Sequence, residues 1–327
     1  MVSSSAPSPS SQITCGKKSQ KATFITTEHL LVGATKVLAL FLYMNKGSDS
    51  MPELPEVETV RRTLFKLVAG KVIKQVQVRW PKMIKKPAEV QQFVDALIGQ
   101  TIIDVERRGK FLKFILDDYV LVSHLRMEGR YGLFKPNEEI DKHTHVIFTF
   151  TDGTELRYRD VRKFGTMHLF NKGEEEQSLP LAILGPEPFS KDFTINSLTK
   201  HLQKTNRKVK VALLDQKIVV GLGNIYVDEA LFRAKIHPER EANTLKPSEI
   251  KRLHHEIIHT LQEAVDKGGS TIRSYVNTQG EIGLFQLQLF VYGQKGEACK
   301  RCGTEIEKTV VGGRGTHFCP KCQRVNK

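Results

Sequence analysis

Cysteine is almost absent from this chain until its last thirty residues. Of the five cysteines in 327 residues, four lie there and only Cys15 stands apart. A secreted disulfide framework spreads its cysteines along the chain, so this distribution favours a reducing cytoplasm instead. A long hydrophobic run is also missing. The apolar stretch 30–44 is short and is interrupted by Lys36, which argues against a membrane span.

Acidic residues are in short supply as well. The 36 Asp and Glu residues are outnumbered by 50 Lys and Arg, which leaves a net charge of +14 and a pI of about 9.5. Such an excess favours a polyanionic partner, because binding a phosphate backbone releases condensed counterions. The charge alone fits a merely basic soluble protein equally well. The length permits two domains with cores of their own.

Residues 1–50 differ in composition from the rest of the chain. Residues 1–11 are rich in Ser and Pro without periodicity, which is typical of disorder. The apolar stretch 30–44 has only a weak basic region before it and no small-residue cleavage site after it, unlike a signal peptide. We therefore expect residues 1–50 to be a leader that is foreign to the fold.

From residue 51 the pattern is typical of a globular protein, with a strand-rich part followed by a helical part. Val57, Val60, Leu64 and Leu67 share one face of a helix expected over 56–67. Strands separated by turn signals are expected over 72–78, 101–107, 111–116, 119–124, 145–150, 155–159 and 165–170. Helices are expected over 195–202, 208–214, 226–234 and 247–267. The sequence thus predicts a β-sandwich followed by a helical part, with a boundary near residue 185.

Two Cys-x-x-Cys pairs end the chain, Cys299 with Cys302 and Cys319 with Cys322. Two such knuckles complete a tetrahedral four-sulfur shell without an open position, which predicts one structural zinc ion. Strands expected over 306–311 and 316–318 form a β-hairpin between the pairs, with Arg314 at its glycine-rich tip. A hairpin of this kind suits a DNA groove. Four unrelated thiols, a redox pair and an ordinary surface arginine are the alternatives.

The stretch Met51-Pro52-Glu53-Leu54-Pro55-Glu56-Val57-Glu58-Thr59 resembles the amino terminus of the formamidopyrimidine-DNA glycosylases, which excise oxidised purines from DNA. The resemblance continues through 107–112, 124–129, 160–165, 221–226 and 291–293 into the hairpin. It covers residues 51–327 and implies an α+β fold. Its parts are a catalytic β-sandwich domain with an amino-terminal helix over 51–184, a helix-two-turn-helix domain over 185–285 and a zinc hairpin over 286–327. Leu54 stands where the endonuclease VIII branch usually has Gly, which favours the purine-lesion branch.

Pro52 carries the predicted chemistry. As an amino-terminal residue it would hold a free secondary amine, partly neutral at working pH, that attacks the sugar C1′ and forms an iminium. The iminium acidifies the C2′ proton, so base loss leads on to strand cleavage. The resemblance assigns proton donation to Glu53, β-elimination and lesion recognition to Lys110, and the δ-elimination step to Arg314. For Glu56 a catalytic and a helix-capping role remain open.

The lesion must leave the base stack before its C1′ is accessible. Met127, Arg162 and Phe164 match the residues that fill the gap in the family, and Arg162 suits the orphaned cytosine. Glu128 and residues 269–283 resemble lesion-pocket material. Phosphate contacts are expected from His124, His143, Arg162, Arg207, Lys210, Asn224 and Tyr292. Asn224 is the best founded of these, because it follows Gly221-x-Gly223 at a helix amino terminus.

The leader decides whether this chemistry is available. With residues 1–50 attached, the Pro52 nitrogen is an internal amide without a proton. We expect Met51 to be the true initiator; proteolytic release of Pro52 and an inactive DNA-damage-binding protein are the alternatives. The predicted function is a bifunctional DNA glycosylase and abasic-site lyase. An endonuclease VIII-like enzyme and a zinc-ribbon transcription factor are further alternatives. We expect a bacterial, cytoplasmic, nucleoid-associated monomer that acts on double-stranded DNA with oxidised purines or abasic sites, without a membrane or an obligate protein partner.

Overall fold

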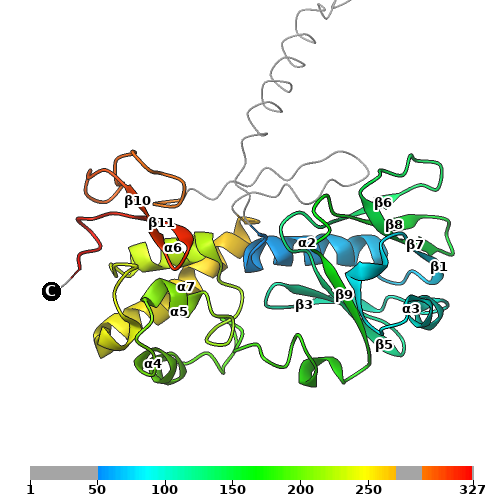
Figure 1. Ribbon diagram of the computed structural model, residues 1–327, viewed down its shortest axis with the longest axis horizontal. Helices are drawn as coiled ribbons and strands as arrows, with labels where there is room; N and C mark the ends of the chain where they lie inside the picture. The colour runs from blue at the N-terminus through cyan, green and yellow to red at the C-terminus, as the bar shows by residue number, and fades with distance from the viewer. Residues whose placement is uncertain (1–50, 270–288, 326–327) are drawn as a thin grey trace, which may run out of the picture. The chain divides into compact units, whose positions relative to one another are not determined.

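The computed structural model describes residues 51–269 and 289–325, all of which belong to one compact unit. Its first half is the predicted β-sandwich (Figure 1). One sheet has the order β1-β7-β8-β6, and every neighbouring pair in it is antiparallel. Its strands are β1 (Ile73–Val78), β6 (Arg130–Phe134), β7 (Thr144–Phe150) and β8 (Glu155–Arg159).

The second sheet has five strands in the order β2-β9-β5-β4-β3. The pairs β3 with β4, β4 with β5, and β5 with β9 are antiparallel, and the short edge strand β2 runs parallel to β9. The strands are β2 (Ile84–Lys86), β3 (Asp104–Arg108), β4 (Phe111–Ile115), β5 (Tyr119–His124) and β9 (Thr166–Asn171). Helix α3 (Val90–Leu97) contacts β1 and β2.

Helix α2 (Leu54–Val68) extends the predicted helix by two residues at its start and one at its end. Its apolar face is buried in the sandwich core as the periodicity predicted, because Val57, Val60 and Leu64 pack with side chains of both sheets. Pro55 lies in the first turn, where a missing backbone N–H costs nothing. The same helix also contacts α7, so it joins the sandwich to the helical part.

The helical part follows a connecting segment between β9 and α4. It comprises α4 (Ile195–Gln203), α5 (Val209–Leu213), α6 (Asn224–Arg233) and α7 (Pro247–Asp266), which share one hydrophobic core. The expected boundary near residue 185 falls within the connecting segment. Among the described residues, no helix is both long and apolar enough to cross a membrane. Most of the expected lesion-pocket segment, residues 270–283, lies outside the described ranges.

Candidate active site and zinc centre

The start of α2 holds two buried carboxyl groups side by side. Glu53 is the residue that precedes the helix, and its backbone N–H donates to Oε2 of Glu56 at 3.0 Å. Their residues are only 2% and 5% exposed, and Pro52 before them is also buried. The Glu56 carboxylate therefore caps the helix, and its Oε1 additionally accepts the Tyr226 hydroxyl at 2.6 Å.

The Glu53 side chain reaches the amino terminus of α6. Its Oε2 accepts the N–H of Gly223 at 2.6 Å, and its Oε1 accepts the N–H of Ile225 at 2.8 Å. These are donors that the first helical turn leaves without intrahelical partners. A Cβ on Gly223 would lie 2.3 Å from the Glu53 Cδ, so only glycine permits this approach. The expected anion site at this helix terminus is filled by a carboxylate of the chain itself.

Burial raises the pKa of Glu53 from 4.5 to about 7, and the charge of Glu56 adds to the increase. Lys110 and the hydrogen bonds from the backbone of α6 act in the opposite direction. Burial outweighs them because removing a carboxylate from water is costly. A carboxyl group that titrates near neutral pH is suited to proton transfer.

Lys110 lies in the turn between β3 and β4, and its ammonium donates to the carbonyl of Leu222 at 2.7 Å. Burial lowers the pKa of Lys110, Glu53 and Glu56 counteract this, and Arg314 lowers it further. The structure therefore brings Glu53, Lys110 and Arg314 into one electrostatic cluster. They come from the start of α2, a sandwich turn and the carboxy-terminal hairpin.

The four cysteines of the two Cys-x-x-Cys pairs converge as the spacing predicted. Their sulfur atoms all lie within 4.8 Å of one another, with Cys299 Sγ 4.0 Å from Cys322 Sγ and Cys302 Sγ 3.5 Å from Cys319 Sγ. A tetrahedral zinc with bonds of about 2.3 Å to sulfur would separate its ligands by about 3.8 Å. The residues present fit one structural zinc ion.

The hairpin beside the zinc centre consists of β10 (Glu307–Val311) and β11 (Arg314–Phe318). Gly312 and Gly313 form its two-residue turn with φ of +56° and +75°, a conformation that favours glycine. Arg314 is therefore the first residue of β11, paired with Val311, and does not occupy the tip as expected. Its side chain is exposed.

The position of Lys210 does not fit the role that the sequence predicts for it. It was expected to contact a phosphate, but it is fully buried, and its ammonium lies 2.7 Å from Oδ1 of Asp228. The ammonium also donates to the carbonyl of Gly315 at 3.0 Å. Lys210 thus tethers the hairpin to α5 and α6. Sequence reasoning did not identify Asp228, because no motif marks a buried ion pair.

The other expected phosphate contacts are distributed over both halves of the fold. Asn224 begins α6 and donates to the Gly315 carbonyl at 2.9 Å, and Tyr292 packs edge-on against His317. Arg207 is exposed and paired with Asp215 at 3.1 Å. His143 is partly exposed.

The surroundings of His124 do not suit a positively charged phosphate contact. It is 6% exposed, its Nδ1 accepts the N–H of Arg126, and its ring packs against Phe111. Burial and the neighbouring charge of Arg126 lower its pKa to about 3. The ring is therefore neutral at physiological pH, and a phosphate contact would use a neutral Nε2–H donor.

Met127 and Phe164 lie on different turns, after β5 and after β8, but line one pocket of about 450 Å³. The basic residues Lys82, Lys85, Arg126 and Lys163 line it too. The Arg162 guanidinium lies over the Phe164 ring at 5.0 Å from its centroid. Glu128 is partly exposed in the Met127 turn. The structure thus groups the three expected intercalating residues on two neighbouring turns.

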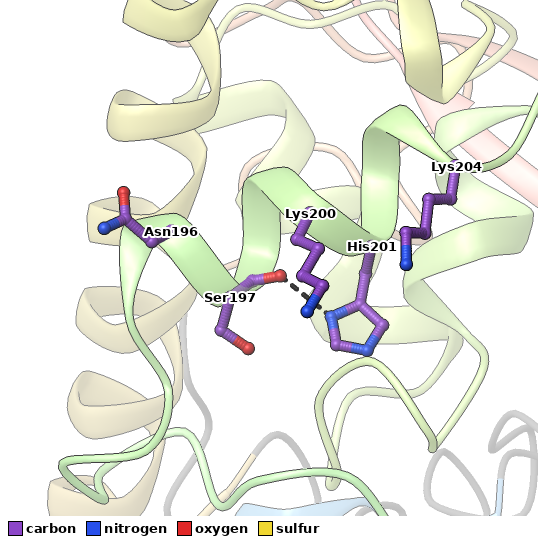
Figure 2. A pocket seen from close by; sticks show the side chains of 5 residues that line it. All are labelled: Asn196, Ser197, Lys200, His201 and Lys204. Atoms are coloured by element: carbon purple, nitrogen blue, oxygen red, sulfur yellow. Dashed lines mark hydrogen bonds between the residues drawn. The ribbon is translucent and has the colours of Figure 1, made fainter.

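A second hollow lies on α4 and contains none of the expected site residues. Figure 2 shows Asn196, Ser197, Lys200, His201 and Lys204 along one face of that helix. The His201 Nδ1 is hydrogen-bonded to the Ser197 carbonyl at 2.8 Å, which is the dashed contact in Figure 2. The polar groups of this hollow are a hydrogen bond within the helix and two exposed lysines, Lys200 and Lys204. They do not converge on one point as the groups of a ligand site do.

Family models match this chain in three consecutive parts. The formamidopyrimidine-DNA glycosylase N-terminal domain matches residues 51–167, the formamidopyrimidine-DNA glycosylase H2TH domain matches 184–276, and a zinc finger found in FPG and IleRS matches 296–325. Together with the buried carboxyl cluster, this three-part architecture defines a zinc-containing DNA glycosylase of base excision repair.

Individual relatives agree with this class. The formamidopyrimidine-DNA glycosylases of Bacillus licheniformis and Bacillus subtilis are each 69% identical to the chain, over 84% of its length and 100% and 99% of their own. The Lactococcus lactis enzyme bound to abasic-site DNA is 45% identical with a TM-score of 0.77, over 84% of this chain and 100% of its own. The chain belongs to the formamidopyrimidine-DNA glycosylase family, whose members have glycosylase and abasic-site lyase activity.

Proposed function

We propose that this enzyme excises oxidised purines, namely 8-oxoguanine and formamidopyrimidines, through a Schiff base on Pro52. The observation that carries the proposal is the position of Glu53. It follows buried Pro52 directly, its own carboxyl group has a pKa raised to about 7, and it shares a cluster with Lys110 and Arg314. A proton donor thus stands next to the residue that would attack the sugar.

In this mechanism the Pro52 amine forms a bond to C1′ while the bond from C1′ to the base breaks. Glu53 supplies a proton to the departing base or to the ring oxygen, so that the base leaves and the sugar ring opens to the iminium. Loss of the C2′ proton from the resulting iminium then expels the 3′ phosphate. A second elimination, in which Arg314 contacts the departing group, expels the 5′ phosphate. Lys110 lies within the same cluster and assists the first elimination.

The reaction requires Pro52 to carry a free amine, so the active form lacks the Met51–Pro52 peptide bond. The matched region supports this requirement, because the family model begins at residue 51 and the curated relatives match only 84% of the chain. We infer that residues 1–51 are absent from the active enzyme. The predicted domains 51–184 (without Met51), 185–285 and 286–327 would then be its catalytic, helix-two-turn-helix and zinc parts.

We propose double-stranded DNA as the substrate, with Met127 and Phe164 filling the space of the flipped lesion and Arg162 facing the orphaned cytosine. His124, His143, Arg207, Asn224 and Tyr292 are proposed phosphate contacts, and Glu128 and Glu56 border the lesion pocket. One solved structure of the Lactococcus lactis enzyme holds DNA containing N7-benzyl-Fapy-dG. We further propose a monomer that works in the bacterial cytoplasm at the nucleoid.

A second candidate substrate class is oxidised pyrimidines, as in the endonuclease VIII branch. One Lactococcus lactis structure holds DNA with an oxidised pyrimidine, so this class is compatible with the fold. Competition between an 8-oxoguanine duplex and an oxidised-pyrimidine duplex under single-turnover conditions separates the two. Preference for the pyrimidine lesion would contradict the purine assignment.

Borohydride trapping on an 8-oxoguanine duplex tests the mechanism. Protein that begins at Pro52 should form a covalent adduct, and the full chain with residues 1–51 should form none. Pro52→Gly replaces the secondary amine of proline with a primary amine of different basicity and geometry, and it should lose most of the adduct. Arg314→Ala should keep the adduct but stop at β-elimination. Absence of an adduct from protein beginning at Pro52 would favour a non-catalytic DNA-damage-binding protein.

A further inference from the structure

Three non-glycine residues of the described ranges have a left-handed backbone, and two of them adjoin proposed intercalating residues. Arg126 with φ of +53° precedes Met127, and Lys163 with φ of +59° precedes Phe164. Side chains other than glycine rarely adopt this conformation, so surrounding contacts must hold it.

The backbone of the turn that contains Lys163 is fixed by Asp160. Its Oδ1 accepts the N–H of Arg162 at 3.0 Å, and its Oδ2 accepts the N–H of Gly165 at 2.8 Å. Asp160 is itself held from below, because its carbonyl is bonded to Nε2 of buried His145 at 2.7 Å. The same carbonyl accepts the N–H of Lys163 at 3.3 Å. These contacts hold the backbone of the turn, and none of them involves the Lys163 side chain.

Trp80 supplies the missing contact. The Lys163 ammonium lies 4.0 Å from the centroid of the Trp80 ring, within the range of a cation–π interaction. The Trp80 backbone N–H donates to the His145 carbonyl at 3.3 Å. The residue that carries the ring is thus bonded to the residue that also holds Asp160. Lys82 lies farther from the same ring, at 5.9 Å. Trp80 and Asp160 therefore both contact the turn that contains Lys163, and both are hydrogen-bonded to His145.

We propose that Trp80 is a positioning residue for the readout of the base opposite the lesion. By holding the Lys163 side chain, the ring acts together with the Asp160 bonds to restrain the peptide planes on either side of Lys163, which set the directions of Arg162 and Phe164. The exposed Phe164 ring and the Arg162 guanidinium over it then enter the DNA already oriented. This inference rests on the proposed role of Arg162 opposite the orphaned cytosine.

A first experiment tests the contact without requiring activity. Trp80 is the only tryptophan in the sequence, so its fluorescence reports on this one ring. Removing the side chain that covers the ring in Lys163→Ala should raise the acrylamide quenching constant about two-fold. Lys82→Ala removes the more distant lysine, is the matched control and should leave the constant nearly unchanged. Equal quenching in wild type and Lys163→Ala would overturn the inference.

A second experiment tests the function. The ratio of kcat/KM for 8-oxoguanine opposite cytosine to that opposite adenine should fall about five-fold in Trp80→Leu, which corresponds to about 1 kcal/mol. Trp80→Phe keeps an aromatic face and should retain most of the ratio. Because Trp80 acts through Lys163, the double variant Trp80→Leu/Lys163→Met should be no worse than either single variant.

Lys163 is exposed, so Lys163→Met keeps the test available if Trp80→Leu does not fold. Lys200→Met on α4 removes one positive charge elsewhere and should leave the ratio unchanged. An unchanged ratio in Lys163→Met with normal excision would overturn the inference while the proposed function stands. Absence of excision by the wild type would instead contradict the proposed function, and the quenching result would still decide the contact.

Discussion

The Glu53 carboxylate and the backbone N–H of Ile225 are 172 residues apart in the chain and form a 2.8 Å hydrogen bond. The bond joins the residue before α2 to the first turn of α6, so it connects the sandwich to the helical part at the proposed reaction centre. It also places an ionisable group where two opposing influences act on it. A helix amino terminus favours the carboxylate, but burial favours the neutral acid, and burial prevails.

The raised pKa of Glu53 predicts a pH dependence of stability. Since the folded-state pKa is about 7 and the ordinary value is 4.5, the contribution of Glu53 is present below pH 4.5 and is lost as pH rises through 7. Glu53→Gln removes this titration. Urea unfolding at pH 5 and pH 8 should show wild type losing up to about 3 kcal/mol relative to the variant.

The same change should alter the activity profile. Single-turnover base excision by wild type should decline as pH rises through about 7, because the neutral acid donates the proton. Glu53→Gln should be slower and flat across that window. The exposed Glu89 gives a control, since Glu89→Gln should reproduce both wild-type profiles. A wild-type rate that stays constant between pH 6 and pH 8 would argue against Glu53 as the acid.

Gly223→Ala should disable the site while leaving most of the fold intact. The new Cβ would lie 2.3 Å from the Glu53 Cδ and would push the carboxylate away from α6. A displacement of this size should reduce base excision about 100-fold. Gly153→Ala is the control, because nothing lies within 4 Å of its added Cβ. That variant should lose about 1 kcal/mol of stability from its left-handed backbone but retain excision. Equal rates in the two variants would refute the close approach.

The buried pair of Lys210 and Asp228 predicts strong coupling in stability. Lys210→Met leaves the Asp228 charge buried without its partner, and it should cost about 3–5 kcal/mol. The double variant Lys210→Met/Asp228→Leu should recover at least half of that loss. Full recovery is not expected, because Asp228 also accepts the N–H of His317 at 2.8 Å. Urea denaturation of wild type, Lys210→Met, Asp228→Leu and the double variant gives a double-mutant cycle. Additive losses of stability in this cycle would contradict the pairing.

Removal of zinc should abolish DNA binding before it affects any other step. The metal holds the base of the hairpin that carries Arg314, whereas Lys210, Asn224 and Asp228 bond only to Gly315 and His317 of β11. Fluorescence anisotropy with an abasic-site duplex should show loss of binding after chelation and its return on adding zinc. Tight binding by zinc-depleted protein would contradict this role of the hairpin.

Much of the fold was predictable because its signals are local. Strands β5 and β8 have the bounds that the alternation and the turn residues predicted. Strand β6 was missed, since Gly132 at its centre weakens the strand pattern. Helix α3 was missed because only Phe93 and Leu97 mark its buried face. The hairpin was predicted, but the two-glycine turn moved Arg314 from the tip into β11.

The sequence by itself determined the zinc ligands, the alternation of strands and helices and the resemblance that identifies the family, because spacing and periodicity are properties of neighbouring residues. Only the tertiary structure decided which groups lose their water. It buried Lys210 against Asp228, placed Glu53 at the amino terminus of α6 and set the Trp80 ring against Lys163. These contacts join residues far apart in the chain. Desolvation and partner choice at such distances depend on packing, which no local pattern encodes.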